Sequence, residues 1–307
     1  MKGKVRESPP VLLMVFNRPQ VAARVVAAVR AGHPGRVFVA ADGPRPGHPN
    51  DAELCDRTRA MVQRSIDWPC EVATLYRDTN LGLQAAVTSA VDWFFEHVDA
   101  GIVLEDDCVP EPDFFPFAGD LLDRYRDEPR VMHVSGLNMR PQETFGADSY
   151  FFAAVGHIWG WATWRRAWQL FEPALPSWPE VRRRTGRGAS PLHRALGHKF
   201  ASARAGRKWT WARAWYYATV RHDGLAVIPA SNLVRNVGFG PEATHTRGGR
   251  HPLRVAPGNG LDFPLRHPAA LSTSPQYAQH LARYHRGSYG RRLSNTLYTF
   301  LDAAAGR

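Results

Sequence analysis

The stretch Val11-Leu-Leu-Met-Val-Phe16, followed by Asn17-Arg18-Pro19, decides how this 307-residue chain is interpreted. Six apolar residues in a row that end at a polar turn are typical of a parallel strand with both faces buried. The Ala/Val/Arg mixture of 20–30 then predicts an amphipathic helix, which Gly32 and Pro34 end. The beginning of the chain therefore predicts a strand followed by a helix.

The same alternation continues to about residue 135. Strands that alternate with helices of this length predict βαβ units and a mostly parallel sheet of the α/β class. Polar residues follow each predicted strand, at the sheet edge where such folds bind ligands. Strands are predicted over 36–41, 70–76, 101–104 and 131–134, and helices over 50–65, 83–97 and 113–126.

The character of the chain changes after about residue 150. Eight of the ten tryptophans lie between Trp159 and Trp215. Residues 182–208 carry nine Lys and Arg with no acidic residue, and this Gly- and Ser-containing stretch predicts a partly mobile segment. A strand is predicted over 225–228, and a closing basic helix over 276–301.

Charge is divided unevenly between the two halves. Residues 1–150 hold 16 Lys and Arg against 22 Asp and Glu, whereas residues 151–307 hold 23 against 6, and the whole chain carries +11. A basic half predicts an anionic partner such as a phosphate or an anionic membrane surface. The excess of Arg over Lys is equally typical of GC-rich coding. Nucleic acid is not predicted as a partner, because no recognition motif accompanies the arginines.

Composition narrows the class further. The chain is 44% hydrophobic and 22% charged, which is ordinary for a folded globular protein. No apolar run approaches the ~18–20 residues that span a bilayer. Three cysteines without metal-site spacing favour a reducing compartment. We therefore expect a cytoplasmic protein, with peripheral attachment to the inner face of the membrane through the basic segments as a further expectation.

Glu105-Asp106-Asp107 is the sharpest local motif. Three adjacent carboxylates at the end of an apolar strand repel one another strongly in a medium of low dielectric constant. A divalent cation relieves that repulsion, and hard oxygen ligands suit Mg²⁺ or Mn²⁺ together with substrate phosphates. A solvated acidic loop is the alternative interpretation.

Other candidate residues also follow predicted strands. Arg18 is expected to hold a nucleotide ribose or phosphate, and Asp42 a base or ribose hydroxyl. Asn80 and Gly82 precede a predicted helix whose N-terminus can bind an anion, or else Asn80 simply caps that helix.

The second half offers two further candidates. Trp161 can stack on a sugar of the acceptor or belong to an aromatic core. His245 can ligate a metal, donate to a diphosphate or be structural.

Taken together, these residues resemble the GT-A class of nucleotide-sugar glycosyltransferases, and within it a bacterial group similar to the Golgi N-acetylglucosaminyltransferase that initiates complex N-glycans. The resemblance covers roughly residues 11–246. Its motifs are Phe16-Asn-Arg-Pro19, Ala41-Asp-Gly-Pro44, Asn80-Leu-Gly82, Glu105-Asp-Asp107, Trp159-Gly-Trp161 and Asn232-Leu-Val-Arg-Asn236-Val-Gly-Phe-Gly240 through Thr244-His-Thr246.

The resemblance implies a Rossmann-like, mostly parallel sheet with a Trp-rich acceptor-side half. It implies an inverting, Mn²⁺- or Mg²⁺-dependent transfer of a hexosyl or N-acetylhexosaminyl group from a nucleotide-diphosphate sugar, with UDP-sugars favoured, to a glycan or lipid-linked saccharide. Asp107 is then the direct metal ligand, while Glu105 and Asp106 contact the donor. The expected organisation is a nucleotide-sugar-binding half over 1–150, an acceptor-side half over 151–250 and a basic extension over 251–307.

One departure concerns the general base. The family has carboxylates between two tryptophans, where this chain has Trp211-Ala212-Arg213-Ala214-Trp215. Among the acids of the second half, Glu242 is the favoured base because it lies three residues before His245. Glu111 and Asp223 are the alternatives. The missing carboxylate also supports a competing hypothesis, an inactive relative that binds a nucleotide sugar or an anionic polymer.

Overall fold

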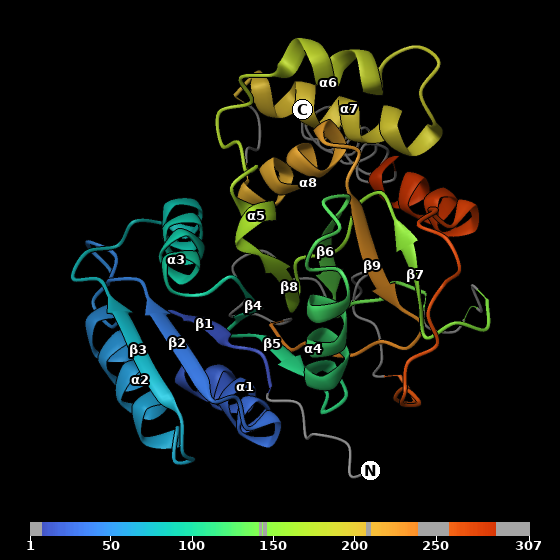
Figure 1. The fold of residues 1–307 in the computed structure, drawn as a ribbon. Helices are drawn as coiled ribbons and strands as arrows, with labels where there is room; N and C mark the ends of the chain where they lie inside the picture. Colours follow the sequence, from blue (N-terminus) through green and yellow to red (C-terminus); the bar gives the residue numbers. More distant parts are fainter. Residues whose placement is uncertain (1–7, 141–142, 144–145, 207–209, 239–257, 287–307) are drawn as a thin grey trace, which may run out of the picture.

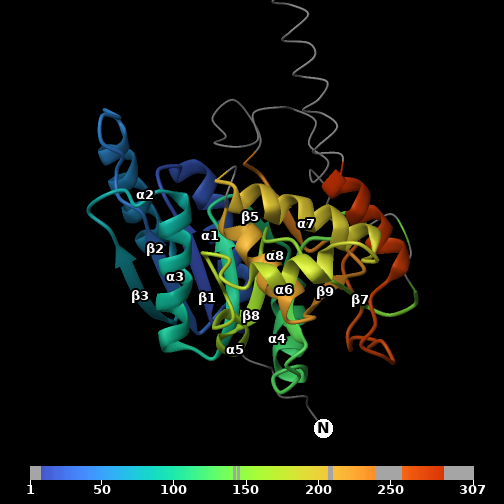
Figure 2. The ribbon, with the colours of Figure 1, turned by 90° about the horizontal axis from the view of Figure 1, so that it is seen from above.

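The computed structural model describes residues 8–140, 143, 146–206, 210–238 and 258–286. It contains an eight-stranded sheet in the order β3-β2-β1-β4-β8-β6-β9-β7. In Figure 2 the strands follow one another in a row from β3 to β7. The strands are β1 (Val11–Val15), β2 (Arg36–Ala41), β3 (Glu71–Tyr76), β4 (Ala100–Glu105), β6 (Val131–Ser135), β7 (Tyr150–Ala153), β8 (Trp161–Trp164) and β9 (Leu225–Pro229).

Strand β1 lies inside the sheet, as its apolar run predicts. It pairs in parallel with β2 and with β4, and all five of its residues are buried. Its side chains alternate between two hydrophobic cores. Leu13 and Val15 pack on one face of the sheet, and Leu12 and Met14 pack on the other. A strand covered on both faces has no position for a polar residue, which explains the uninterrupted run.

Helices cover both faces. α1 and α2 lie on one side of β1–β3 and α3 lies on the other (Figures 1 and 2). The α1 residues Val25 and Val29 belong to the first core, while Val91 and Phe94 of α3 belong to the second. The helices are α1 (Pro19–Gly32), α2 (Asp51–Ser65), α3 (Leu83–His97), α4 (Phe114–Arg124), α5 (Arg165–Trp168), α6 (Trp178–Thr185), α7 (Pro191–Arg204) and α8 (Trp211–Arg221), and residues 275–286 are also helical.

The second half of the chain completes the same sheet. β8 is antiparallel to both β4 and β6, β9 is parallel to β6, and β7 is antiparallel to β9. The fold is therefore the mixed, mostly parallel α/β sheet that the sequence predicts. A separate two-stranded sheet joins β5 (Cys108–Pro110) to β10 (Val234–Asn236) and links the end of β4 to the second half.

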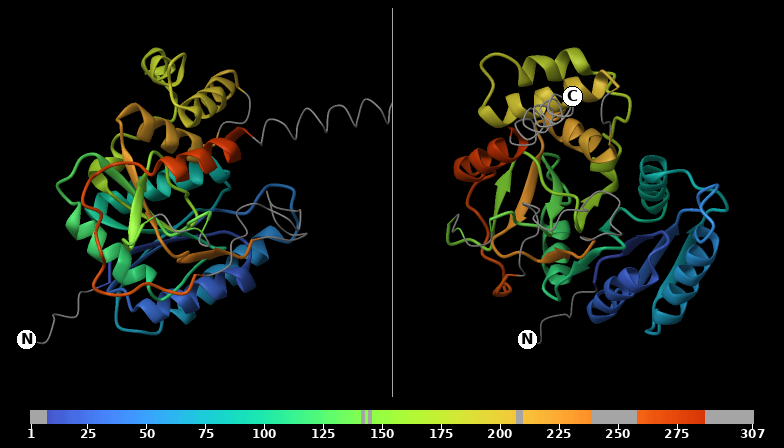
Figure 3. Two further views of the ribbon diagram at one scale, coloured as in Figure 1. Left: turned by 90° about the vertical axis from the view of Figure 1, so that its right-hand side faces the viewer. Right: turned by 180° about the vertical axis from the view of Figure 1, so that it is seen from behind.

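The prediction of a partly mobile segment over 182–208 is wrong for its described residues. α6 and α7 form a helical layer on α8, at the top of both views of Figure 3. Leu192, Leu196 and Phe200 recur at intervals of four and are buried in a third core. This spacing makes an amphipathic helix, with Arg194 and Arg204 on its exposed face.

The length and composition of the helices also bear on membranes. Among the helices that the structure describes, none is long and apolar enough to cross a bilayer. Most of the closing helix predicted over 276–301 lies outside the described residues, which show a helix over 275–286.

Candidate functional site

A cavity of about 1070 Å³ opens at the carboxyl ends of β1, β2 and β4. The start of α3 and the strand β10 complete its wall. Its size is in the range of ligand sites. The polar residues around it are Asn17, Arg18, Gln20, Asp42, Arg45, His48, Arg77, Asn80, Glu105, Asp106, Asp107 and Asn236.

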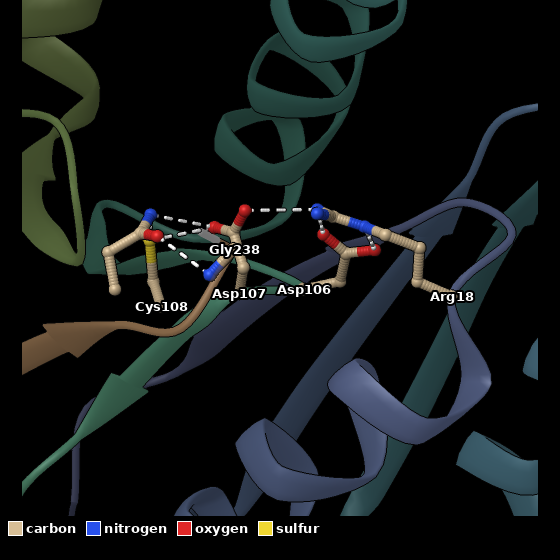
Figure 4. A network of polar contacts seen from close by, with 6 residues as sticks. Arg18, Asp106, Asp107, Cys108 and Gly238 are labelled. Carbon is tan, nitrogen blue, oxygen red and sulfur yellow. Dashed lines mark hydrogen bonds and ion pairs between the residues drawn. The ribbon is translucent and has the colours of Figure 1, made fainter. Parts of the chain in front are cut away.

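Arg18 and the carboxylate triplet line the same cavity, and the Arg18 guanidinium contacts Asp106 and Asp107 (Figure 4). β1 and β4 are parallel neighbours, so Arg18, three residues after β1, reaches Asp106, which directly follows β4. The guanidinium makes a two-pronged contact, with Nε 3.1 Å from Asp106 Oδ2 and Nη2 on Asp106 Oδ1. Nη2 also donates to Asp107 Oδ2 at 3.0 Å. One cation therefore bridges two adjacent carboxylates.

Asp107 is held from the opposite side by β10. Asn236 Nδ2 donates to Asp107 Oδ1 at 3.0 Å, and the Cys108 thiol lies 3.5 Å from the same oxygen. The Asn236 side chain is itself fixed, because its Oδ1 accepts from the Gly238 backbone N–H at 2.9 Å. A Cβ on Gly238 would overlap Asp107 Oδ2, so a larger residue here would displace the Asp107 carboxylate. The small sheet β5–β10 thus sets the orientation of the Asp107 carboxylate.

Burial changes the acidity of the triplet. It raises the pKa of Glu105, and the charges of Asp107 and Asp106 raise it further while Arg18 opposes them. Burial also raises the pKa of Asp106, against the contacts with Arg18 that lower it. The Glu105 side chain has no hydrogen-bond or ion-pair partner among the described residues, and Glu105 lines the cavity. Its carboxyl group is available to a ligand.

The donor set is compatible with a hard divalent cation. The described residues contain no cluster of three or more His, Cys, Asp or Glu around one point. Mg²⁺ and Mn²⁺, however, are commonly held by one or two carboxylates together with substrate phosphates. Glu105 and Asp107 offer hard oxygens on the cavity wall, and Arg18 already places one positive charge beside Asp106 and Asp107.

Asp42 also lines the cavity, but both of its carboxylate oxygens accept hydrogen bonds from the protein itself. Oδ1 accepts from the backbone N–H groups of Gly43 and Leu81, each at 2.9 Å. Oδ2 accepts from Asn80 Nδ2 at 3.0 Å and from the Gly82 N–H at 3.2 Å. Four donors tie the end of β2 to the loop before α3. The predicted contact of Asp42 with a nucleotide stays a prediction, and the geometry adds a structural role.

Asn80 does not cap the helix that follows. α3 begins at Leu83, and the position before it is Gly82, whose φ of 77° favours glycine. The Asn80 amide instead donates to Asp42 and to the carbonyl of Gly43. Asn80 and Gly82 line the cavity, and their predicted contact with an anionic ligand stays a prediction.

Trp161 needs a correction. Its side chain is 1% exposed and lies in the second core, so the predicted contact with an acceptor sugar has no exposed ring face to use. It stacks on His133 at 5.1 Å between ring centroids and packs against Trp211 and Trp215. Trp215 Nε1 donates to His133 Nδ1 at 3.0 Å. Of the two interpretations of this tryptophan, the structure supports the aromatic core.

The predicted base and the second predicted metal ligand, Glu242 and His245, lie outside the described residues. Both alternative bases are held by arginines: Glu111 accepts from Arg235 Nε at 2.6 Å, and Asp223 pairs with Arg184.

Sequence reasoning gave no role to two residues that shape the site. Asn236 and Gly238 belong to the sequence motif over 232–240. The two residues are two positions apart, and the Gly238 N–H donates to the Asn236 side chain. Both contact Asp107, which lies 129 residues before Asn236, so the motif is the only local sign of their role.

No family model matches the chain, and no curated protein sequence matches it. Solved structures resemble it in part. The mannosyltransferase PcManGT from Pyrobaculum calidifontis, in complex with GDP-Man and Mn²⁺, is 14% identical over 71% of this chain and 70% of its own, with a TM-score of 0.36. A UDP-glucose pyrophosphorylase complexed with UDP-glucose is 8% identical over 71% of this chain and 89% of its own, with a TM-score of 0.34.

The bifunctional glycosyltransferase WbbM, in its apo form, is 14% identical over 71% of this chain, with a TM-score of 0.30. This chain covers 38% of WbbM, well under half of its length. At TM-scores this low the likenesses are partial, and the site stands on its own residues.

Proposed function

We propose that the protein is a metal-dependent inverting glycosyltransferase. It would move a hexosyl or N-acetylhexosaminyl group from a nucleotide-diphosphate sugar to a glycan or a lipid-linked saccharide. The observation that carries the proposal is the meeting of Glu105, Asp106 and Asp107 with Arg18 on the wall of a cavity at the carboxyl edge of the sheet.

The charges of the site explain why a diphosphate would bind there with a cation. A diphosphate brought to three carboxylates is repelled unless positive charge lies between them. Arg18 supplies one such charge and suits two-pronged contact with phosphate oxygens. A bound Mn²⁺ or Mg²⁺ would neutralise the charge that develops on the departing diphosphate. In this proposal Asp107 holds the cation.

The remaining carboxyl groups would bind the donor. Glu105 lacks a partner among the described residues and can accept hydrogen bonds from sugar hydroxyls. Asp106, 5% exposed, would mainly hold Arg18 at the cavity wall and contact the ribose once Arg18 is drawn to the phosphates. In this arrangement each carboxylate would face a hydroxyl of the nucleotide sugar, Arg18 or the metal ion.

Inversion also requires a group that takes the proton of the acceptor hydroxyl. The described carboxylates that line the cavity are the triplet, which has other roles in this proposal, and Asp42, whose oxygens accept four hydrogen bonds within the protein. Glu242 therefore stays the proposed base. Glu242→Gln should lower turnover by about 10²-fold or more with donor binding retained. Near-normal turnover would move the assignment to Glu111 or Asp223.

The proposal includes binding of the protein to an anionic membrane surface through its second half. Between Glu180 and Asp223 the chain has no acidic residue, and α6 and α7 turn several arginines outward. Basic residues near an anionic surface contribute about 1 kcal/mol each. Such a layer would hold the protein beside a lipid-linked acceptor. The exposed arginines are Arg182, Arg183, Arg184, Arg187, Arg194 and Arg204.

Vesicle co-sedimentation tests this surface. Vesicles containing phosphatidylserine should sediment the protein at low salt, and phosphatidylcholine vesicles should not. Replacing three arginines of the layer by Gln should weaken sedimentation, whereas replacing three exposed arginines of α1 and α2 should not. The matched sets are Arg182, Arg183 and Arg194 against Arg24, Arg57 and Arg64. Equal loss in both sets would contradict a specific surface.

The activity itself is tested by release of nucleoside diphosphate. UDP-sugars are expected to be the best substrates, and GDP-mannose belongs in the panel as the ligand of a partial structural relative. Release that requires Mn²⁺ or Mg²⁺ and stops in EDTA would support the proposal. Tight metal-dependent binding of a nucleotide sugar without any turnover would instead favour the inactive-relative hypothesis.

A further inference from the structure

The two carboxylate oxygens of Asp107 have different partners. Asn236 and Cys108 both contact Oδ1. Oδ2 is the oxygen that would remain for a cation, and the Arg18 guanidinium is bonded to it at 3.0 Å (Figure 4). A cation at Asp107 Oδ2 would lie beside the Arg18 guanidinium, and repulsion between the two positive charges weakens its binding there.

We infer that Arg18 is a built-in counterion, which occupies the cation's place on Asp106 and Asp107 until a diphosphate draws it away. The inference rests on the proposed function and adds an order of events to it. Without a ligand, Arg18 compensates the clustered carboxylates. With a diphosphate in the cavity, its guanidinium gains an alternative anionic partner, and the carboxylates become available to a divalent cation.

The backbone around Arg18 allows this exchange. The Arg18 carbonyl accepts from the Ala22 N–H at 3.0 Å at the start of α1, and Pro19 follows as the first helical residue. The main chain is therefore fixed by the helix. The long side chain is 23% exposed, so its guanidinium can rotate toward the cavity without unfolding any element.

Asp107, by contrast, stays in place. The bond from Asn236 and the close approach of Gly238 hold its carboxylate whether or not Arg18 is present. A fixed carboxylate with a movable counterion couples two binding events. A diphosphate should strengthen cation binding partly by removing Arg18, and a cation should favour the diphosphate in return, because such coupling is reciprocal.

The experiment titrates Mn²⁺ into the nucleotide-free protein and measures the free ion by electron paramagnetic resonance. Arg18→Gln should bind Mn²⁺ about tenfold more tightly than the wild type, in the usual range of coupling between sites. It should at the same time bind UDP less tightly. A damaged site would bind Mn²⁺ more weakly, so the direction of the change separates release of the carboxylates from damage.

Two controls sharpen the result. Arg77 lines the same cavity, but its side chain donates to the Ser89 hydroxyl at 2.7 Å. Arg77→Gln removes the same charge without freeing a carboxylate, so it should leave Mn²⁺ affinity near the wild-type value. Adding Asp107→Asn to Arg18→Gln should abolish the gain.

Unchanged or weaker Mn²⁺ binding by Arg18→Gln would overturn the counterion role. So would an equal gain in Arg77→Gln, because net charge alone would then explain it. The proposed function fails separately, if the wild-type protein binds neither UDP nor GDP in the presence of Mn²⁺. A wild type that binds them, without a gain in Arg18→Gln, would refute this inference alone.

Discussion

The carboxylate triplet lies at the end of strand β4, and the tryptophan cluster includes Trp161 of the neighbouring strand β8. Val103 of β4 pairs with Trp161 of β8, and Glu105 ends β4 two residues later. The triplet lines the cavity, whereas Trp161, Trp168, Trp211 and Trp215 fill the second core.

The difference follows from what each group needs on leaving water. An indole has one polar group, and a single acceptor satisfies it: Trp164 donates to the Leu122 carbonyl and Trp168 to Asp92. Adjacent carboxylates lose solvation and repel one another, so one partner each is not enough. Tryptophans can therefore be buried in numbers, whereas Asp106 and Asp107 are paired with the positive charge of Arg18.

The largest expected effect concerns His133, which is buried in the tryptophan cluster. Burial lowers its pKa from 6.5 to about 3. The unfolded chain then binds the proton more readily than the folded one, so the free energy of unfolding should fall as pH drops from about 6.5 toward 3. The shift corresponds to at most roughly 5 kcal/mol.

His133→Gln tests this contribution, because Gln keeps a donor for the His157 carbonyl and an acceptor for Trp215 but cannot titrate. Urea unfolding between pH 7 and pH 4 should show a shallower loss of stability in the variant. Parallel pH profiles for the two proteins would contradict the assignment.

The second prediction concerns the triplet. Asp107→Asn keeps the size of the side chain and removes its charge, so Mn²⁺-dependent nucleotide binding should fall about 100-fold or more, since even outer-shell partners of a metal cost 10–100-fold. Calorimetry with UDP in Mn²⁺ and in EDTA measures it. Wild-type affinity that is the same in EDTA would show that Asp107 holds no cation.

The third prediction concerns Asp42. Like the triplet, it is a carboxylate at the end of a strand, but its hydrogen bonds give it a structural role. Asp42→Ala leaves four donors without their acceptor and should lower the free energy of unfolding by about 1–3 kcal/mol. Mn²⁺ binding should be unaffected. Asp78→Ala, at an exposed position on the loop between β3 and α3, is the control and should change stability by less than about 0.5 kcal/mol.

The smallest expected effect tests the positioning of Asp107. Gly238→Ala places a methyl group against Asp107 Oδ2 and should turn the carboxylate, with about a tenfold loss of Mn²⁺ affinity. Gly119→Ala, where a Cβ makes only ordinary contacts, should leave that affinity unchanged. An unchanged affinity in Gly238→Ala would mean that the Asp107 carboxylate need not keep this orientation.

Local patterns predicted much of the fold. The strands at 36–41 and 131–135 and the helix at 83–97 match their predictions to within a residue, because hydrophobic periodicity is a property of a short segment. The Arg, Gly and Ser content of residues 182–208 hides helix α7, although its apolar residues recur every four positions. Burial of these apolar residues against neighbouring helices stabilises the helix.

The sequence by itself determined where the carboxylate triplet stands, at the end of an apolar strand that is buried on both faces. Only the tertiary structure decided what meets it. Arg18 lies 88 residues before Asp106, and Asn236 lies 129 residues after Asp107. These contacts depend on β1 lying beside β4 and on β10 pairing with β5. Strand order comes from the packing of the whole chain, because no short segment encodes which strands become neighbours.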